Sequence, residues 1–138
     1  MKKVIFIFIC LFSISMFSQQ NQYKWLNDFN KASVEATNQN KPILIYFTNS
    51  KNCEVCKKNE ETLFNSSEFK SIANKTILMI VDRANDDVAS QRLSIHYNKA
   101  NAYPSFVTID KKGKILGDTL TSFDTTSLNS YINFINSL

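Results

Sequence analysis

The amino-acid sequence predicts an α/β fold in which helices cover both faces of a mixed central sheet. Apolar residues recur with helical or strand spacing in the order helix, strand, helix, strand, helix, strand, strand, helix. Helices separate the first two strands, which should therefore be parallel. Residues 110–113, Asp-Lys-Lys-Gly, indicate a hairpin turn that would make the last two strands antiparallel. Alternating helices and strands that end in a hairpin are typical of this class.

The first half of the predicted domain supplies two helices around a buried strand. Residues 25–36 carry apolar side chains at helical spacing, namely Trp25, Phe29, Ala32 and Ala36. Residues 43–47, Ile-Leu-Ile-Tyr-Phe, form a short apolar run that is typical of a buried strand. Asn52 is then the expected N-cap of a helix over residues 53–64, which is rich in lysine and glutamate.

The second half completes the sheet and its cover. A capping pattern, with Glu68 three residues after Asn65, predicts another short helix. The remaining expected elements are a strand over residues 76–81, a helix over about 86–97, strands over 104–109 and from 114 onward, and a final helix over 123–138.

Residues 1–18 have the three-part pattern of a secretory signal peptide. Two lysines follow the initial methionine, residues 4–17 are uncharged and almost wholly apolar, and small residues precede a polar run. The apolar segment is shorter than the roughly 20 residues that a membrane span needs. We therefore predict cleavage after Ser15 or Ser18 and loss of Cys10 with the peptide. Residues 19–138 would then form a periplasmic or secreted domain with no membrane attachment.

The length of residues 19–138 suits one domain with a single core, which we expect to be a monomer. Two lysines leave with the signal peptide, so the remaining net charge is only mildly positive. Lysines and acidic residues are interleaved, without the basic run or stacking surface that nucleic-acid binding requires. The composition therefore argues against a nucleic-acid partner.

Cys53 and Cys56 are the only cysteines outside the predicted signal peptide, and their spacing is Cys-x-x-Cys. Disulfides persist outside the cytosol, but a bridge across two residues closes too small a loop to stabilise the fold much. A metal site that included His96, the single histidine, would lack a fourth protein ligand. These arguments favour a redox centre without a metal or another cofactor.

The motif and its surroundings resemble the thioredoxin superfamily over nearly the whole predicted domain. The resemblance rests on the segments KPILIYF, CEVCK, AYPSF and IDKKGKILG. The run CEVCKKNEETLFNSSEFKSIANKTILMIVD is similar to exported members, including the periplasmic C-terminal domain of transmembrane thiol:disulfide interchange proteins. The resemblance implies a thioredoxin-like fold and a cis proline at position 104. It also implies that the backbone of Tyr103 and Pro104 pairs with substrate like an added strand.

The position of Cys53 at the start of a helix assigns the two cysteines different roles. Unpaired N–H groups and the helix dipole stabilise a thiolate there, so Cys53 should attack the substrate and Cys56 should resolve the mixed disulfide. Lys51 and Lys57 should lower the pKa of Cys53, whereas Glu54 should raise it. Because Glu54 opposes a very stable thiolate, the motif favours disulfide reduction or exchange over primary oxidation.

Two positions depart from the common pattern of the superfamily. Asn52 stands where members commonly carry tryptophan before the first cysteine. Tyr46 stands where thioredoxins bury an acid that manages the proton of the resolving cysteine. A proton acceptor for Cys56 must therefore come from elsewhere, with Glu60 or water as the candidates.

The predicted function is that of an exported thiol:disulfide oxidoreductase that reduces or exchanges disulfides in proteins. Its partners would be protein thiol or disulfide substrates and a redox partner protein. An alternative stays open because of the two departures: a redox-inert binding protein of thioredoxin fold in which the Cys53–Cys56 disulfide persists.

Overall fold

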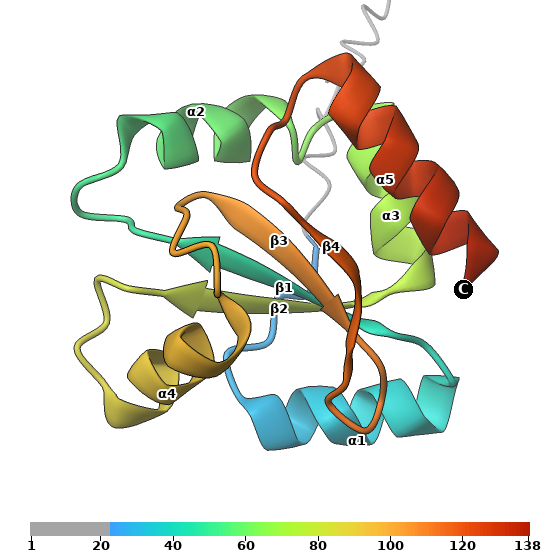
Figure 1. Ribbon diagram of the computed structural model, residues 1–138, viewed down its shortest axis with the longest axis horizontal. Helices are drawn as coiled ribbons and strands as arrows, with labels where there is room; N and C mark the ends of the chain where they lie inside the picture. The colour runs from blue at the N-terminus through green and yellow to red at the C-terminus, as the bar shows by residue number, and fades with distance from the viewer. Residues whose placement is uncertain (1–22) are drawn as a thin grey trace, which may run out of the picture.

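A computed structural model describes residues 23–138, so the predicted signal peptide lies outside the described residues (Figure 1). Four strands form one sheet in the order β2-β1-β3-β4. The strands are β1 (Ile43–Thr48), β2 (Ile77–Asp82), β3 (Ser105–Ile109) and β4 (Ile115–Leu120). β1 pairs in parallel with β2 and antiparallel with β3, and β3 pairs antiparallel with β4. The mixed sheet predicted from the sequence is thereby confirmed.

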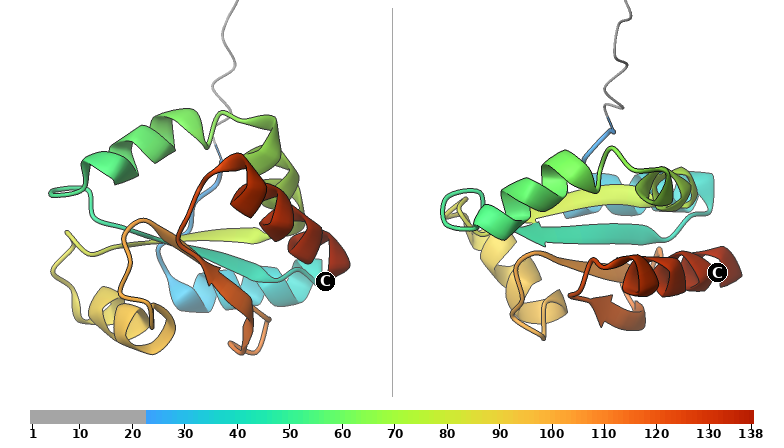
Figure 2. Two further views of the ribbon diagram at one scale, coloured as in Figure 1. Left: turned by 45° about the horizontal axis from the view of Figure 1, so that its top comes forward. Right: turned by 90° about the horizontal axis from the view of Figure 1, so that it is seen from above.

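Helices cover both faces of this sheet, as the sequence predicts. They are α1 (Phe29–Gln39), α2 (Glu54–Thr62), α3 (Ser67–Lys75), α4 (Val88–Tyr97) and α5 (Thr125–Ser137). α1 and α4 lie on one face, and α2, α3 and α5 lie on the other (Figures 1 and 2). No helix within residues 23–138 is long and apolar enough to cross a membrane.

The core consists of two layers that the central strand β1 joins. Ile43, Ile45 and Phe47 pack with α1 and α4, while Leu44 and Tyr46 pack with α3 and α5. All six residues of β1 are buried. Because both faces of the strand are covered, its sequence is an uninterrupted apolar run rather than an alternating one.

The helix predicted over residues 25–36 begins four residues too early. The structure starts α1 at Phe29, because the Asp28 side chain accepts a hydrogen bond from the Lys31 N–H at 3.0 Å. An aspartate at this position satisfies a free N–H of the first turn and fixes the helix start. Trp25 therefore lies outside the helix and packs against the rings of Tyr46, Phe64 and Phe69.

In two further helices the N-cap lies one residue later than predicted. The N-cap of α2 is Cys53 rather than Asn52, and the N-cap of α3 is Ser66 rather than Asn65. In both cases the side chain of the observed cap accepts the N–H three residues further along. The strand and hairpin predictions agree with the structure to within a residue or two at their ends.

Candidate redox site

Cys53 and Cys56 lie at the start of α2, the helix that follows β1. They form a disulfide with their Cα atoms 5.2 Å apart. Cys53 is partly exposed, whereas Cys56 is completely buried. Of the two sulfur atoms, only that of Cys53 can therefore be reached by a sulfur atom of another molecule. This difference is the one required by the predicted roles of attacking and resolving cysteine.

The sulfur of Cys53 itself caps α2. The Cys56 N–H donates a hydrogen bond to Cys53 Sγ over 3.0 Å. In the reduced protein, this N–H and the positive end of the helix dipole would stabilise a thiolate at Cys53. Because the sulfur itself, and not the Asn52 side chain, occupies the capping position, the helix end acts on Cys53 directly.

The segment before β3 borders the exposed cysteine. The carbonyl oxygen of Tyr103 lies 3.6 Å from Cys53 Sγ, and the Tyr103–Pro104 peptide bond is cis. The antiparallel register of β1 and β3, in which Phe47 lies opposite Ser105, brings these distant parts of the chain together. Tyr103, followed by the buried Pro104, thus lies beside the sulfur of Cys53, and substrate binding by this backbone stays a prediction.

The loop that carries Cys53 is fastened to the end of β2. Asp82 Oδ1 accepts the N–H of Ser50 at 3.0 Å and that of Ala84 at 2.9 Å. The N–H of the intervening residue, Arg83, donates to the Thr48 carbonyl at 2.9 Å. Burial opposes ionisation of Asp82, but the hydrogen bonds and the nearby Lys51 outweigh it and hold the pKa of Asp82 below its ordinary value. An ionised Asp82 therefore helps to order the loop.

A second carboxylate lies under α2. Glu60 Oε1 accepts hydrogen bonds from Thr48 Oγ1 at 3.0 Å and from the Tyr46 hydroxyl at 3.3 Å. Glu60 follows Cys56 by four residues, so both face the same side of the helix. Burial raises the pKa of Tyr46 well above its ordinary value, so the hydroxyl stays a donor at neutral pH. These two hydrogen bonds hold the Glu60 carboxylate beneath α2, one helical turn from Cys56.

The two residues predicted to tune the thiol pKa are paired with each other. Lys57 Nζ lies 3.4 Å from Glu54 Oε1, and both side chains are exposed. The pair offsets part of each charge, and water screens the remainder. We therefore expect the cap at Cys53 to influence the thiol more than either of these side chains.

His96 lies away from this cluster, exposed on α4, with its ring against the ring of Tyr97. Within the described residues, no group of three or more histidine, cysteine, aspartate or glutamate side chains could hold a metal ion.

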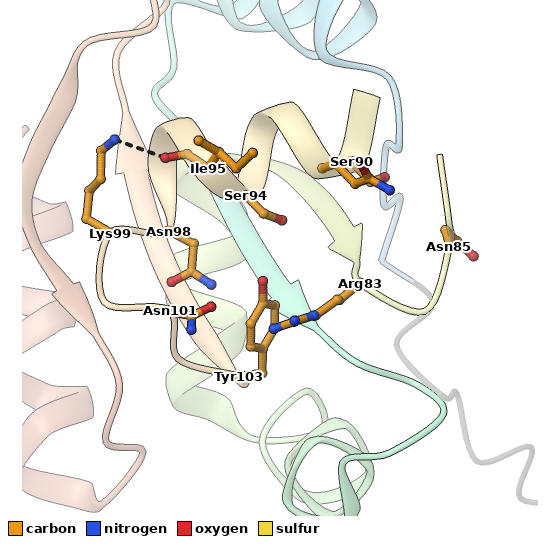
Figure 3. Close-up of a pocket in the computed structure, with 10 residues that line it drawn as sticks. Arg83, Asn85, Ser90, Ser94, Ile95, Asn98, Lys99, Asn101 and Tyr103 are labelled. Atoms are coloured by element: carbon orange, nitrogen blue, oxygen red, sulfur yellow. Dashed lines mark hydrogen bonds between the residues drawn. The ribbon is translucent and has the colours of Figure 1, made fainter. Parts of the chain in front are cut away.

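Arg83 is a neighbour of the site that the sequence did not single out. Its guanidinium carbon lies 5.3 Å from the centre of the Tyr103 ring, a cation–π contact. Figure 3 shows the Arg83 side chain extended alongside that ring, with a pocket between them and α4. No sequence pattern links residues 83 and 103, because only the fold brings the ends of β2 and the segment before β3 together.

The class defined by this fold and by a cysteine pair opening a helix is that of the thioredoxin-like proteins. The family model described as thioredoxin-like matches residues 24–111, more than half of the chain. The chain belongs to this family. No curated protein matched the chain in a sequence comparison.

Solved structures of similar fold include an oxidoreductase and a disulphide isomerase. The "DsbH Oxidoreductase" is 24% identical, with a TM-score of 0.68 over 83% of this chain and 85% of that one. A disulphide isomerase from Xylella fastidiosa Temecula1 is 19% identical, with a TM-score of 0.61 over 83% and 99%. The oxidised C-terminal domain of DsbD from Neisseria meningitidis is 14% identical, with a TM-score of 0.63 over 83% and 98%. At these identities the likeness shows the fold.

The loop anchor at Asp82 predicts a stability difference that depends on pH. The pKa of Asp82 is lowered in the folded state, so its contribution is present above an unfolded pKa of about 4 and is lost as pH falls through the folded value. We expect Asp82→Asn to lower the free energy of unfolding by about 1 kcal/mol at pH ~7, since solvent limits the effect of a partly exposed group. Denaturant titrations should show the difference shrinking at pH ~3. Asp118→Asn, at an exposed position of β4, is the matched control. A loss of stability in Asp82→Asn that does not change with pH would contradict a role for the Asp82 charge.

Proposed function

We propose that this protein is an exported thiol:disulfide oxidoreductase that reduces or exchanges disulfides in protein substrates. One observation carries the proposal: Cys53 Sγ receives the Cys56 N–H at the start of α2 and lies 3.6 Å from the Tyr103 carbonyl. The helix end activates this sulfur as a nucleophile, and the backbone of the partly exposed Tyr103 beside it offers a place for an extended substrate chain.

In the reducing direction, the Cys53 thiolate attacks one sulfur of a substrate disulfide. A mixed disulfide forms between Cys53 and the substrate, and the other substrate sulfur leaves as a thiolate. Cys56 then loses its proton and attacks Cys53 Sγ, which releases the second substrate sulfur. The substrate gains two electrons and two protons, and the protein ends with the Cys53–Cys56 disulfide. A redox partner protein must then supply two electrons to regenerate the dithiol.

Glu60 is the proposed acceptor for the proton of Cys56. Cys56 is completely buried, so bulk water has poor access to its thiol. Glu60 lies one helical turn away on the same side of α2, held by Thr48 and Tyr46. This arrangement would let a glutamate on α2 replace the acid that thioredoxins bury in the preceding strand, a position occupied here by Tyr46.

Export and direction belong to the same proposal. The signal-like pattern of residues 1–18 supports a periplasmic or secreted location. The helix cap stabilises a Cys53 thiolate, whereas Glu54, whose negative charge Lys57 offsets only in part, opposes it. A moderately stabilised thiolate favours a reductant or an exchange catalyst over a primary oxidant.

The cysteine roles predict two distinct phenotypes in a reduction assay with insulin. The pre-reduced protein should reduce insulin, and Cys53→Ser should abolish the activity, because it removes the attacking sulfur. Cys56→Ser should accumulate mixed disulfides that are visible by mass spectrometry before and after reduction. Normal turnover by Cys56→Ser would contradict the role of Cys56. Absence of turnover by the parent protein, with thiols unreactive in the folded state, would favour the redox-inert alternative.

The role of Glu60 predicts a slow resolving step when its charge is removed. Glu60→Gln keeps the size of the side chain but cannot accept a proton, so the rate of mixed-disulfide resolution should fall at least about tenfold. The measurement is the decay of a preformed mixed disulfide at Cys53. Glu61→Gln, an exposed neighbour on α2, should decay at the parental rate. Equal rates in both variants would leave water as the acceptor.

The proposed direction predicts the reduction potential of the cysteine pair. Equilibration with glutathione should give a value nearer about −270 mV, typical of thioredoxin reductants, than about −120 mV, typical of strong oxidants. The fraction of disulfide can be followed by thiol alkylation and mass spectrometry. A value close to the oxidant end would reverse the proposed direction without affecting the assignment of the two cysteines.

A further inference from the structure

A pocket lies beside Tyr103, the residue whose carbonyl is next to the sulfur of Cys53. It has a volume of about 410 Å³ and lies between α4, the end of β2 and the segment before β3 (Figure 3). Its lining includes Arg83, Ser94, Asn98, Lys99, Asn101 and Tyr103. The size is that of a small cleft able to receive one side chain and its neighbouring backbone.

The pocket and the reactive sulfur meet at the same residue. The carbonyl of Tyr103 faces Cys53 Sγ at 3.6 Å, whereas its ring lines the pocket. A chain that pairs with the Tyr103 backbone while its disulfide reaches Cys53 would therefore pass along the Tyr103 side chain. Side chains of an extended strand alternate in direction, so a residue within one or two positions of the substrate cysteine can enter the pocket.

The ionisable side chains that line the pocket are basic. Arg83 and Lys99 contribute cations, and no aspartate or glutamate lines it. Within residues 23–138, the Arg83 guanidinium makes no ion pair, and its contact is with the Tyr103 ring. The Lys99 ammonium donates to the Ile95 carbonyl, which uses one of its three protons (Figure 3).

Among the described residues, the nearby carboxylates form no ion pair with Arg83 or Lys99, and each of them accepts hydrogen bonds from other donors. Asp82 accepts the N–H groups of Ser50 and Ala84, Asp86 accepts from the Gln91 side chain, and Asp87 caps α4 through the N–H of Ser90. The guanidinium therefore keeps its planar set of donors for an outside carboxylate, which it can bind in a bidentate manner.

From this geometry we infer that the pocket is a specificity subsite for an acidic side chain, aspartate or glutamate, close to the reacting cysteine of a protein substrate. The inference rests on the proposed function, since it names the class of substrate that the redox site would prefer. Arg83 is the main binding residue. Lys99 adds positive charge, and the amides and hydroxyls of the pocket offer further donors.

The test uses two peptides that each hold one disulfide and differ only in having glutamate or glutamine on both sides of the attacked cysteine. Pre-reduced protein is mixed with each peptide in a single turnover, so that the Cys53–Cys56 dithiol is oxidised as the peptide disulfide gains two electrons and two protons. The rate of release of peptide thiols is measured at low and at high salt. The parent protein should prefer the glutamate peptide by about threefold, and salt should reduce that preference.

Three variants locate the preference. Arg83→Gln should bring the glutamate-to-glutamine rate ratio close to one, and Arg83→Lys should retain a preference because it keeps the charge. Lys112→Gln, in the turn between β3 and β4, makes the same change in net charge away from the pocket and should keep the parental ratio. The salt dependence of the parent protein tests the charge argument even if a variant fails to fold.

The possible results of these assays separate the acidic subsite, its assignment to this pocket and the proposed function. Equal rates for both peptides in the parent protein would overturn the acidic subsite and leave the proposed oxidoreductase intact. A preference that survives in Arg83→Gln would overturn the assignment to this pocket. Failure of the parent protein to reduce either peptide would overturn the proposed function itself, together with the subsite that rests on it.

Discussion

The double pairing of β1 is the constraint on which the rest of the structure depends. It joins β2 in parallel on one side and β3 antiparallel on the other, and all six of its residues are buried. Because β1 and β3 run in opposite directions, the end of β1 meets the beginning of β3. The loop with Cys53 and the segment with Tyr103 therefore lie at the same end of the sheet. A purely parallel arrangement would have placed them at opposite ends.

The large features of this fold follow from residue patterns that act over short distances. The order of apolar helices and strands, together with the turn at 110–113, predicts a mixed sheet with helices on both faces. The errors lie at helix starts, where a single side chain decides. Asp28 ends the extended segment that precedes α1, and its competition with the apolar spacing from Trp25 onward could not be judged without tertiary contacts. The cap at Cys53 was missed because cysteine is not a common capping residue.

The candidate site likewise contains some residues that the sequence marks and others that it does not. The cysteine pair and the proline before β3 are visible in the sequence, since a motif or a resemblance marks them. Thr48 and Arg83 carry no such mark. Thr48 contributes only because the last residue of β1 turns its hydroxyl toward Glu60, and Arg83 only because β2 ends beside Tyr103. Contacts between residues far apart in the chain, such as these, depend on strand order and register, which local spacing does not encode.

The extended segment before α1 also contacts the sheet. Leu26 donates its N–H to the Leu78 carbonyl and accepts the N–H of Ile80, so it adds a short bridge to the outer side of β2. An uncovered strand edge invites pairing with other chains, and this bridge occupies part of it. Proteolytic trimming up to Asp28 would thus remove this bridge and expose the outer side of β2 as a template for self-association.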